Sequence, residues 1–320
     1  MTEYSPLASP RATLQALEYW GLHNKKSLGQ HWLVDDGVIG RILRLADRLE
    51  TPASTADISA LGVAKQRRDW PVLEIGPGLG TLTEALLRQS NVVQAVEIDQ
   101  RLQPVLEDIR QRYPKAFSYQ LADALQLEPS SLPEHFDLVA NLPYQLAATL
   151  ILRAFAEWPG LCSATVMVQS EVAERLLSTP GSKNYGAVTV KLALLASDAG
   201  NFKVSRRSFL PPPRVDSTVL RLERLSGPQA FPRAEWPRAR QFIDAAFAER
   251  RKTLKNSLLS AWLLPAEAGM AGSKVPVEWL DELLSAADID GSRRAETLSV
   301  AEFCRLLAAW REREDLHSLL

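Results

Sequence analysis

Short apolar segments that alternate with amphipathic stretches constrain the fold of this chain most strongly. The segments "WPVLEIG", "NVVQAVEID", "FDLVANLPY" and "SATVMVQSEV" are predicted strands, and helices are predicted after them over 79–89, 102–111, 145–155 and up to residue 177. A further predicted strand, "AFSYQLADAL", leads into a polar connection instead. This alternation is typical of a doubly wound, mostly parallel α/β sheet.

The rest of the chain is arranged around this sheet. Residues 1–30 carry Pro6 and Pro10 and are predicted to form an irregular arm, which precedes a helix over 37–50 and a loop-like insertion over 51–69. The extended stretches "NFKVSRRSF" and "STVLRLERL" are predicted to pair as an antiparallel hairpin. A Pro-rich break near 226–232 precedes helical spacing of apolar residues. We therefore predict an α/β domain over 31–226 and a smaller all-helical domain over 227–320.

Composition excludes several function classes. Lys and Arg number 37 and Asp and Glu 38, so the net charge of −1 predicts no partner and only local basic clusters point to one. Cys162 and Cys304 lack CxxC spacing, and the four histidines lack metal-ligand spacing. We see neither a signal peptide nor an apolar run long enough to span a bilayer. We expect a reduced, cytoplasmic protein without a metal site.

Glycines occupy the turn after the first predicted strand. In "VLEIGPGLGTLT", Gly76, Gly78 and Gly80 let a ligand approach the backbone closely, because no Cβ intervenes. Ligands of open α/β sheets bind beyond the carboxyl ends of the strands, where this turn lies. The pattern is neither GxGxxG nor a P-loop. Taken alone, it also fits an ordinary tight turn.

Carboxylates recur at the predicted strand ends, at Glu74, Glu97, Asp99 and Asp123. Each of them alone fits a solvated surface or a helix cap. Together they would repel a pyrophosphate, which disfavours NAD and favours a ligand with ribose, adenine and a positive centre. S-adenosylmethionine is such a ligand. We expect Glu97 to accept from its ribose hydroxyls and Asp123 from its adenine amine, which predicts a methyltransferase.

The fourth strand ends in Asn141-Leu142-Pro143-Tyr144, which would face the transferred methyl group. The Asn141 side-chain oxygen and the Leu142 carbonyl are two acceptors for the N–H bonds of an exocyclic base amine. Pro143 stiffens the turn, and Tyr144 offers a ring on which a base can stack. The tetrapeptide alone also fits an ordinary turn. Because Cys162 does not lie at this strand end, carbon methylation of cytosine is disfavoured.

In combination, these motifs resemble the KsgA family of rRNA adenine N(6)-dimethyltransferases over about residues 25–310. The resemblance rests on "KKSLGQHWLVDD", "VLEIGPGLGTLT", "VEID", "DAL", "NLPY", "SKNYGAVTV", "SFLPPPRVDSTVLRL", "FAERRKTLKNSL" and "RAETLSVAEFCRL". It implies a Rossmann-like class I methyltransferase fold that uses S-adenosylmethionine. It also implies dimethylation of two adjacent adenosines in the hairpin loop near the 3′ end of small-subunit (16S) rRNA, in a late assembly intermediate, by a monomer.

The resemblance also implies roles for particular residues. The predicted cofactor-binding residues are Gln30, His31, Leu33, Glu74, Gly76, Gly78, Glu97, Ile98, Asp123, Ala124 and Asn141. The predicted catalytic residues are Asn141, Leu142, Pro143 and Tyr144, with Phe209 as a second stacking ring. His31 and Trp32 stand where the family usually has Asn and Phe. A backbone contact with the donor from position 31 survives that change.

Three basic clusters are predicted to bind the phosphates of the RNA around one pocket. The clusters are Lys25 and Lys26; Arg206, Arg207 and Arg214; and Arg250, Arg251, Lys252 and Lys255. A run of charges alone more often marks a solvated helix face. The prediction therefore depends on the accompanying base pocket, because phosphate contacts carry no sequence information.

Other hypotheses remain open at this point. One is a resistance-type methylase that acts on a large-subunit adenosine, although the "PPPRVDS" and "RAETLSV" segments favour the small subunit. Another is a non-catalytic protein, such as an assembly checkpoint or one of the related mitochondrial transcription factors. The complete set of Glu97, Asp123 and residues 141–144 argues against loss of catalysis. An NAD-dependent dehydrogenase is disfavoured because this chain lacks the glycine pattern of that class.

Overall fold

The computed structural model describes residues 3–23, 30–49, 70–89, 91–227, 231–261 and 276–317, with side chains up to residue 313. Lys25, Lys26 and the 51–69 insertion lie outside these residues. The chain divides into two compact units. The first comprises residues 1–173 and 197–224, and the second comprises residues 174–196 and 225–320.

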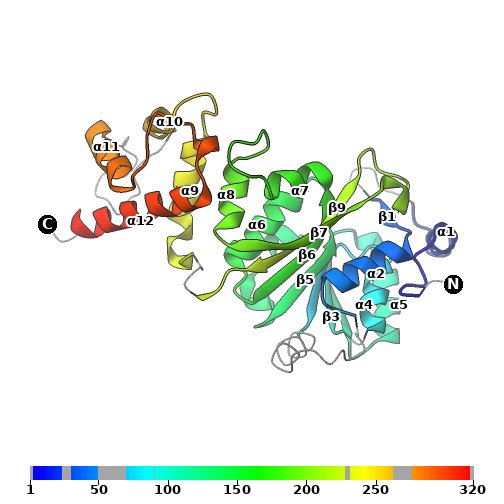
Figure 1. Ribbon diagram of the computed structural model, residues 1–320. Helices are drawn as coiled ribbons and strands as arrows, with labels where there is room; N and C mark the ends of the chain where they lie inside the picture. The colour runs from blue at the N-terminus through cyan, green and yellow to red at the C-terminus, as the bar shows by residue number, and fades with distance from the viewer. Residues whose placement is uncertain are drawn as a thin grey trace, which may run out of the picture. The chain divides into compact units, whose positions relative to one another are not determined.

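A seven-stranded sheet in the order β4-β3-β2-β5-β6-β9-β7 organises the first unit (Figure 1). The strands are β2 (Val72–Ile75), β3 (Val93–Glu97), β4 (Phe117–Leu121), β5 (Phe136–Asn141), β6 (Leu161–Gln169), β7 (Ala196–Val204) and β9 (Ser217–Arg224). Strands β2 to β6 run parallel, and β9 is antiparallel to β6. The predicted mostly parallel α/β sheet is confirmed, and β7 and β9 are neighbours in it, as expected of the last two extended stretches.

Helices precede and connect these strands. Helices α1 (Pro10–Tyr19) and α2 (Asp36–Leu45) come before β2, and α4 (Thr81–Arg88), α5 (Gln103–Arg112), α6 (Ala147–Glu157) and α7 (Ser170–Leu176) follow β2, β3, β5 and β6. Ile39 of α2, Leu86 of α4 and Leu106 of α5 share one core with Val72 and Val93 of the sheet. Each such buried side chain contributes about 1.5–3 kcal/mol to folding. This packing holds the carboxyl ends of the strands in fixed positions.

The N-terminal residues do not form the irregular arm that their prolines predicted. Ser9 caps α1, and Pro10 occupies its first turn, where a missing N–H leaves no hydrogen bond unmade. Asp36 at the start of α2 accepts hydrogen bonds from the backbone N–H groups of Tyr4 and Ser5 at 3.1 and 2.9 Å. The prolines therefore begin a helix, and a carboxylate fixes the residues before it.

Short 3-10 helices and a second, two-stranded sheet complete the elements of the described chain. The 3-10 helices are η2 (Gln100–Leu102), η3 (Ala124–Gln126), η4 (Pro129–Ser131), η5 (Arg206–Ser208), η7 (Arg233–Glu235) and η9 (Ala295–Thr297). The two-stranded sheet consists of β1 (Trp32–Leu33) and β8 (Phe209–Leu210). The connection between β4 and β5 contains only η3 and η4, as its polar sequence predicted.

The second unit is helical. Its helices are α8 (Ala187–Ala193), α9 (Trp236–Phe247), α10 (Leu254–Ala261), α11 (Val277–Ala286) and α12 (Val300–His317). Phe242, Leu280 and Phe303 lie in its core. Residues 174–196, which we predicted in the α/β domain, group with this unit because Tyr185 joins that core and donates to the Leu298 carbonyl at 2.8 Å. Within the residues that the structure describes, no helix is both long and apolar enough to cross a bilayer.

Candidate active site

The two-stranded sheet brings the segment after residue 30 beside the loop that contains Pro211, Pro212 and Pro213, which we call the proline-rich loop. Leu33 of β1 lies opposite Phe209 of β8. The Val34 N–H donates to the Ser208 carbonyl at 2.8 Å, and the Ser208 hydroxyl donates to Asp35 at 2.7 Å. Two segments far apart in the sequence therefore run side by side at the edge of the site.

Phe209, the predicted second stacking ring, is only 2% exposed. It belongs to the hydrophobic core together with Trp32 and Leu33. The pairing of β8 with β1 turns this ring inward, so a base does not reach it in this conformation. A stacking role for Phe209 stays a prediction, and it requires the ring to become accessible.

The glycine loop between β2 and α4 lies beside residues 141–144, the predicted catalytic turn. Gly76 and Gly78 have φ angles of 70° and 59°, which side-chain-bearing residues rarely adopt. A Cβ on Gly78 would approach the Trp32 ring to 2.7 Å. A Cβ on Gly76 would have the Asn141 carbonyl oxygen as its nearest neighbour, at 3.9 Å. The structure therefore brings together the predicted donor loop and the predicted catalytic turn.

Two carboxyls beneath this loop are buried. The Thr83 hydroxyl donates to Glu74 at 2.6 Å, and burial raises the pKa of Glu74 to about 8, with a smaller contribution from nearby Glu97. Glu97 accepts hydrogen bonds from the N–H groups of Gly78 and Asp99 at 3.3 and 2.9 Å. Burial also raises the pKa of Glu97. Among the described residues, no basic side chain pairs with either carboxyl.

Asp99 has a different environment from Glu97. Arg101 donates to both of its oxygens at 2.9 and 2.6 Å, and the Gln30 side chain donates to it at 2.8 Å. The hydrogen bonds from Arg101 lower the pKa of Asp99 to about 2. Asp99 therefore fixes the position of Gln30, and Glu97 is left as the acid that faces the loop. Sequence analysis did not single out Arg101.

A depression lies at the end of β4. Asp123 accepts a hydrogen bond from the Leu125 N–H at 2.9 Å and lines a depression of about 340 Å³. Ala124 follows at the start of η3 and is partly buried. On the neighbouring strand end, Ile98 exposes 53% of its surface, which is unusual for an isoleucine. These placements are compatible with the predicted adenine contacts.

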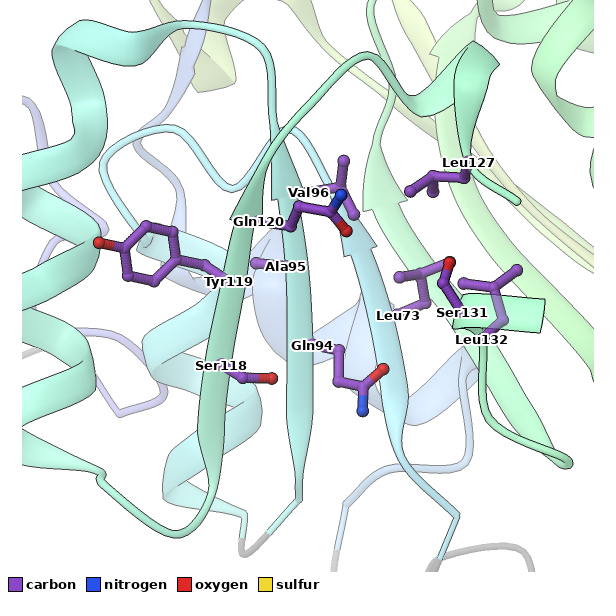
Figure 2. A pocket seen from close by; sticks show the side chains of 10 residues that line it. All are labelled: Leu73, Gln94, Ala95, Val96, Ser118, Tyr119, Gln120, Leu127, Ser131 and Leu132. Atoms are coloured by element: carbon purple, nitrogen blue, oxygen red, sulfur yellow. The ribbon is translucent and has the colours of Figure 1, made fainter. Parts of the chain in front are cut away.

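A second depression, of about 250 Å³, lies on the sheet face between β2, β3 and β4 (Figure 2). Gln94, Ser118 and Gln120 line it, whereas Tyr119 points away and its hydroxyl donates to Glu107 of α5 at 3.2 Å. None of the described residues around it is charged. It lies along the strands and not at their carboxyl ends, so it is not the candidate active site.

The turn at residues 141–144 is fixed by its backbone. The Leu142 N–H donates to the Met167 carbonyl of β6 at 3.1 Å, and the Leu142 side chain is 2% exposed. The Pro143 carbonyl accepts from the Leu146 N–H at 3.1 Å. No described residue hydrogen-bonds the side-chain amide of Asn141, which is partly exposed at the strand end. The turn therefore holds Asn141 with an unused side-chain acceptor.

Tyr144 is held from two sides. Its hydroxyl shares a 2.9 Å hydrogen bond with the Ser217 hydroxyl of β9. The His31 ring stacks on it with centroids 6.1 Å apart and planes 25° apart. Burial raises the pKa of Tyr144, so the phenol stays protonated at neutral pH. Sequence analysis missed Ser217, and it predicted a contact of His31 with the donor but none with Tyr144.

Comparison with known proteins agrees with these motifs. The sequence matches the ribosomal RNA adenine dimethylase family over residues 21–306. The chain belongs to this family. A relative from Kineococcus radiotolerans, named ribosomal RNA small subunit methyltransferase A, is 40% identical over 307 residues, which are 95% of this chain and 92% of that protein.

Solved structures show the same fold. A dimethyladenosine transferase from Plasmodium falciparum superposes with a TM-score of 0.66 at 23% identity over 88% of this chain and 98% of that chain. The 23S rRNA methyltransferase ErmE superposes with a TM-score of 0.59 at 28% identity over 87% and 98%. The class I methyltransferase fold is confirmed, and this dimethylase is an enzyme that depends on S-adenosylmethionine.

The described residues of this dimethylase fit that methyl donor. Glu74 and Glu97 are buried acids for which the described residues supply no basic partner, so a positively charged ligand near them is favoured and would promote loss of the Glu74 proton. A carboxylate accepts about four hydrogen bonds, so Glu97 retains capacity for the ribose hydroxyls. Gln30, Gly76 and Asp123 are the further residues that would hold the donor.

The two described basic clusters differ in how they are paired. Arg206, Arg207 and Arg214 of the dimethylase are exposed, and none of their guanidinium groups pairs with a described acidic side chain, although the Arg206 backbone N–H donates to Asp216 at 2.9 Å. In the second unit, three of the four cluster members have acidic partners. These pairs are Arg250 with Glu296 at 3.1 Å, Lys252 with Glu249 at 2.8 Å, and Lys255 with Asp281 at 2.8 Å. Arg251 is exposed and pairs with no described acid.

Proposed function

We propose that this dimethylase methylates N6 of two adjacent adenosines in the hairpin loop near the 3′ end of small-subunit rRNA, twice each, within a late assembly intermediate. The observation that supports this best is the position of Asn141 beside Gly76. The backbone of Asn141 therefore lies next to the glycine loop, and no described residue hydrogen-bonds its side-chain amide. The small-subunit substrate is supported by the 40% identical relative that carries that name.

The chemistry follows from the weak nucleophilicity of an exocyclic amine, whose lone pair is delocalised into the base. The bound donor supplies an electrophilic methyl group. The Asn141 side-chain oxygen and the Leu142 carbonyl accept the two N–H bonds of the amine, which moves the nitrogen toward tetrahedral geometry and directs its lone pair. The hydrogen bond from Leu142 to Met167 holds this carbonyl in place. The methylated amine is a strong acid, so it loses its proton without a dedicated base.

Tyr144 provides the surface for the base. Stacking of a base on an aromatic ring contributes about 1–3 kcal/mol. The target adenosine must leave its stack to reach the turn, and this contribution offsets part of that cost. Since the Tyr144 hydroxyl is bonded to Ser217, the phenol is held in place and takes no part in proton transfer.

We infer that Arg206, Arg207, Arg214 and Arg251 contact phosphates of the rRNA, because they are exposed and lack described acidic partners. Such contacts supply affinity and positioning, and the turn at residues 141–144 supplies the choice of base. We also infer that the enzyme acts in the cytoplasm as a monomer. Gel filtration with light scattering would test the oligomeric state.

Methyl transfer from labelled S-adenosylmethionine to unmethylated small subunits tests the function, with large subunits and the Asn141→Ala variant as controls. Reverse-transcription stops map the modified bases. We expect stops at two adjacent adenosines in the 3′-terminal hairpin and none with the variant. Label in large-subunit RNA would support the resistance-type methylase instead. Confirmed donor binding without any transfer would support a scaffold role.

A further inference from the structure

His31 contacts both the catalytic turn and the proline-rich loop. We propose that His31 is a positioning residue that fixes the ring of Tyr144 for the target base. This role rests on the proposed function, and it differs from the backbone contact with the donor that the sequence predicted. The evidence for this role is the stacking of the His31 ring on Tyr144 and its hydrogen bond to Pro211, both within the first unit.

The imidazole is itself held firmly. Its Nδ1 lies 2.7 Å from the Pro211 carbonyl oxygen. A carbonyl only accepts hydrogen bonds, so Nδ1 carries a hydrogen and donates it. Trp32 lies opposite Leu210 in the β1–β8 ladder, which places His31 opposite Pro211. The ladder and this hydrogen bond together set the orientation of the His31 ring.

Tyr144 is then restrained at its face and at its hydroxyl. The His31 ring stacks on it at 6.1 Å and 25°, a geometry within the usual range of attractive aromatic pairs. Ser217, which is completely buried, bonds the hydroxyl at 2.9 Å. A ring that is restrained before binding loses less freedom when a base stacks on it. His31 therefore promotes methyl transfer by acting through Tyr144.

Three substitutions distinguish the contribution of the His31 ring from that of its hydrogen bond. His31→Phe keeps a ring and removes the donor to Pro211. His31→Asn keeps a donor and removes the ring, and it restores the residue that the family usually has. His31→Ala removes both features.

The kinetic measurement is single-turnover methylation of unmethylated small subunits, with binding of S-adenosylhomocysteine to the free protein measured by calorimetry. We expect His31→Ala to slow methylation by roughly ten-fold, in proportion to the loss of one aromatic pair and one hydrogen bond. We expect the dissociation constant for S-adenosylhomocysteine to stay within about two-fold of wild type. His31→Phe should recover most of the rate, and His31→Asn should not. Full recovery by His31→Asn, or a wild-type rate in His31→Ala, would overturn the proposal.

A second readout needs neither RNA nor donor. The protein has six tyrosines, so 3-fluorotyrosine labelling gives few ¹⁹F signals, and Tyr144→Phe assigns the one of interest. We expect His31→Ala to shift and broaden the Tyr144 signal and His31→Phe to restore it. The matched control is His135→Ala, which removes a ring stacked on Trp70 with centroids 5.2 Å apart and should leave the Tyr144 signal unchanged.

The two readouts distinguish the two hypotheses. If wild-type protein transfers no methyl group, the proposed function fails, and the fluorine signals still decide the role of His31. An unchanged Tyr144 signal in His31→Ala would overturn that role even where methylation of small subunits is confirmed.

Discussion

The Thr83 hydroxyl donates a 2.6 Å hydrogen bond to Glu74, a carboxyl that is only 2% exposed. Burial raises the pKa of Glu74 to about 8, and the nearby carboxyl of Glu97 adds to this effect. The acid beneath the glycine loop is therefore largely protonated in the folded protein at neutral pH. A positively charged ligand near it would favour loss of that proton.

Glu74→Gln is expected to change how stability depends on pH. The ordinary pKa of a glutamate is 4.5, as expected in an unfolded chain, and burial raises it to about 8 in the fold, so between these pH values the folded state keeps a proton that the unfolded state has released. The unfolding free energy of wild type should fall across this window as pH rises, and Glu74→Gln should lack this loss. The difference in unfolding free energy between Glu74→Gln and wild type should therefore grow with pH by on the order of a few kcal/mol up to about pH 8.

Urea unfolding of both proteins at pH 5, 7 and 9 measures that gap. Glu134→Gln, at an exposed glutamate, is the control and should show no pH-dependent difference from wild type. A constant gap between Glu74→Gln and wild type at all three pH values would mean that Glu74 is ionised in the fold.

Ser217→Ala is expected to slow methyl transfer through Tyr144. The lost hydrogen bond contributes about 0.5–1.5 kcal/mol, which corresponds to roughly 2- to 12-fold in rate. Tyr144→Phe removes the other partner of the same hydrogen bond. The double variant should therefore methylate little more slowly than either single variant. Single-turnover rates of the four proteins give the coupling, and additive effects would show that the bond does not matter. Ser170→Ala, which removes a hydroxyl bonded to Thr218 on the same strand, is the matched control.

Much of the site could be predicted because parallel strands end at one edge of a sheet. Each strand end that the alternation placed carries one of Gly76, Glu97, Asp123 and Asn141, and the structure puts all four at that edge. The α1 helix could also have been found from sequence, since Ser9 before a proline is a helix-start signal. We did not predict this helix because we interpreted the prolines as helix breakers.

The remaining features depend on contacts between distant residues. Phe209 is buried because the two-residue strand β8 pairs with Leu33, a pairing that no local pattern announces. Ser217 bonds Tyr144 from across the sheet, and Tyr185 joins the second unit through Leu298. Periodicity predicts elements well, whereas the partners of such side chains follow only from the tertiary fold.

Asn141→Ala is expected to abolish most methyl transfer and to leave RNA binding near that of wild type. Removal of one polarising group from such a site typically lowers the rate by roughly 10²–10³-fold. Single-turnover methylation and filter binding to small subunits measure the two quantities separately. A wild-type rate in this variant would contradict the role of the amide as an acceptor for the amine.

Glu97→Ala is expected to weaken donor binding with little effect on RNA affinity. Hydrogen bonds to a charged group contribute about 1.5–3 kcal/mol, so the dissociation constant for S-adenosylmethionine should rise by roughly 10- to 150-fold. Asp108→Ala, at a half-exposed carboxylate of α5 that pairs with Arg112, is a control that should not change it. Calorimetry with the free protein measures both, and an unchanged constant in Glu97→Ala would remove this residue from the ribose contact.

The pairing of the basic cluster in the second unit predicts that neighbouring charges contribute unequally to RNA binding. Arg251 has no described acidic partner, whereas Glu249 lies 2.8 Å from Lys252 and already neutralises it. Each phosphate contact contributes about 0.7–0.9 to the slope of log affinity against log salt. Arg251→Glu should therefore flatten the slope for small-subunit binding by about one contact or more, and Lys252→Glu should flatten it less. Reversal of a charge that binds phosphate changes the number of counterions released on binding. Equal slopes in the two variants and wild type would therefore mean that this cluster is a solvated helix face.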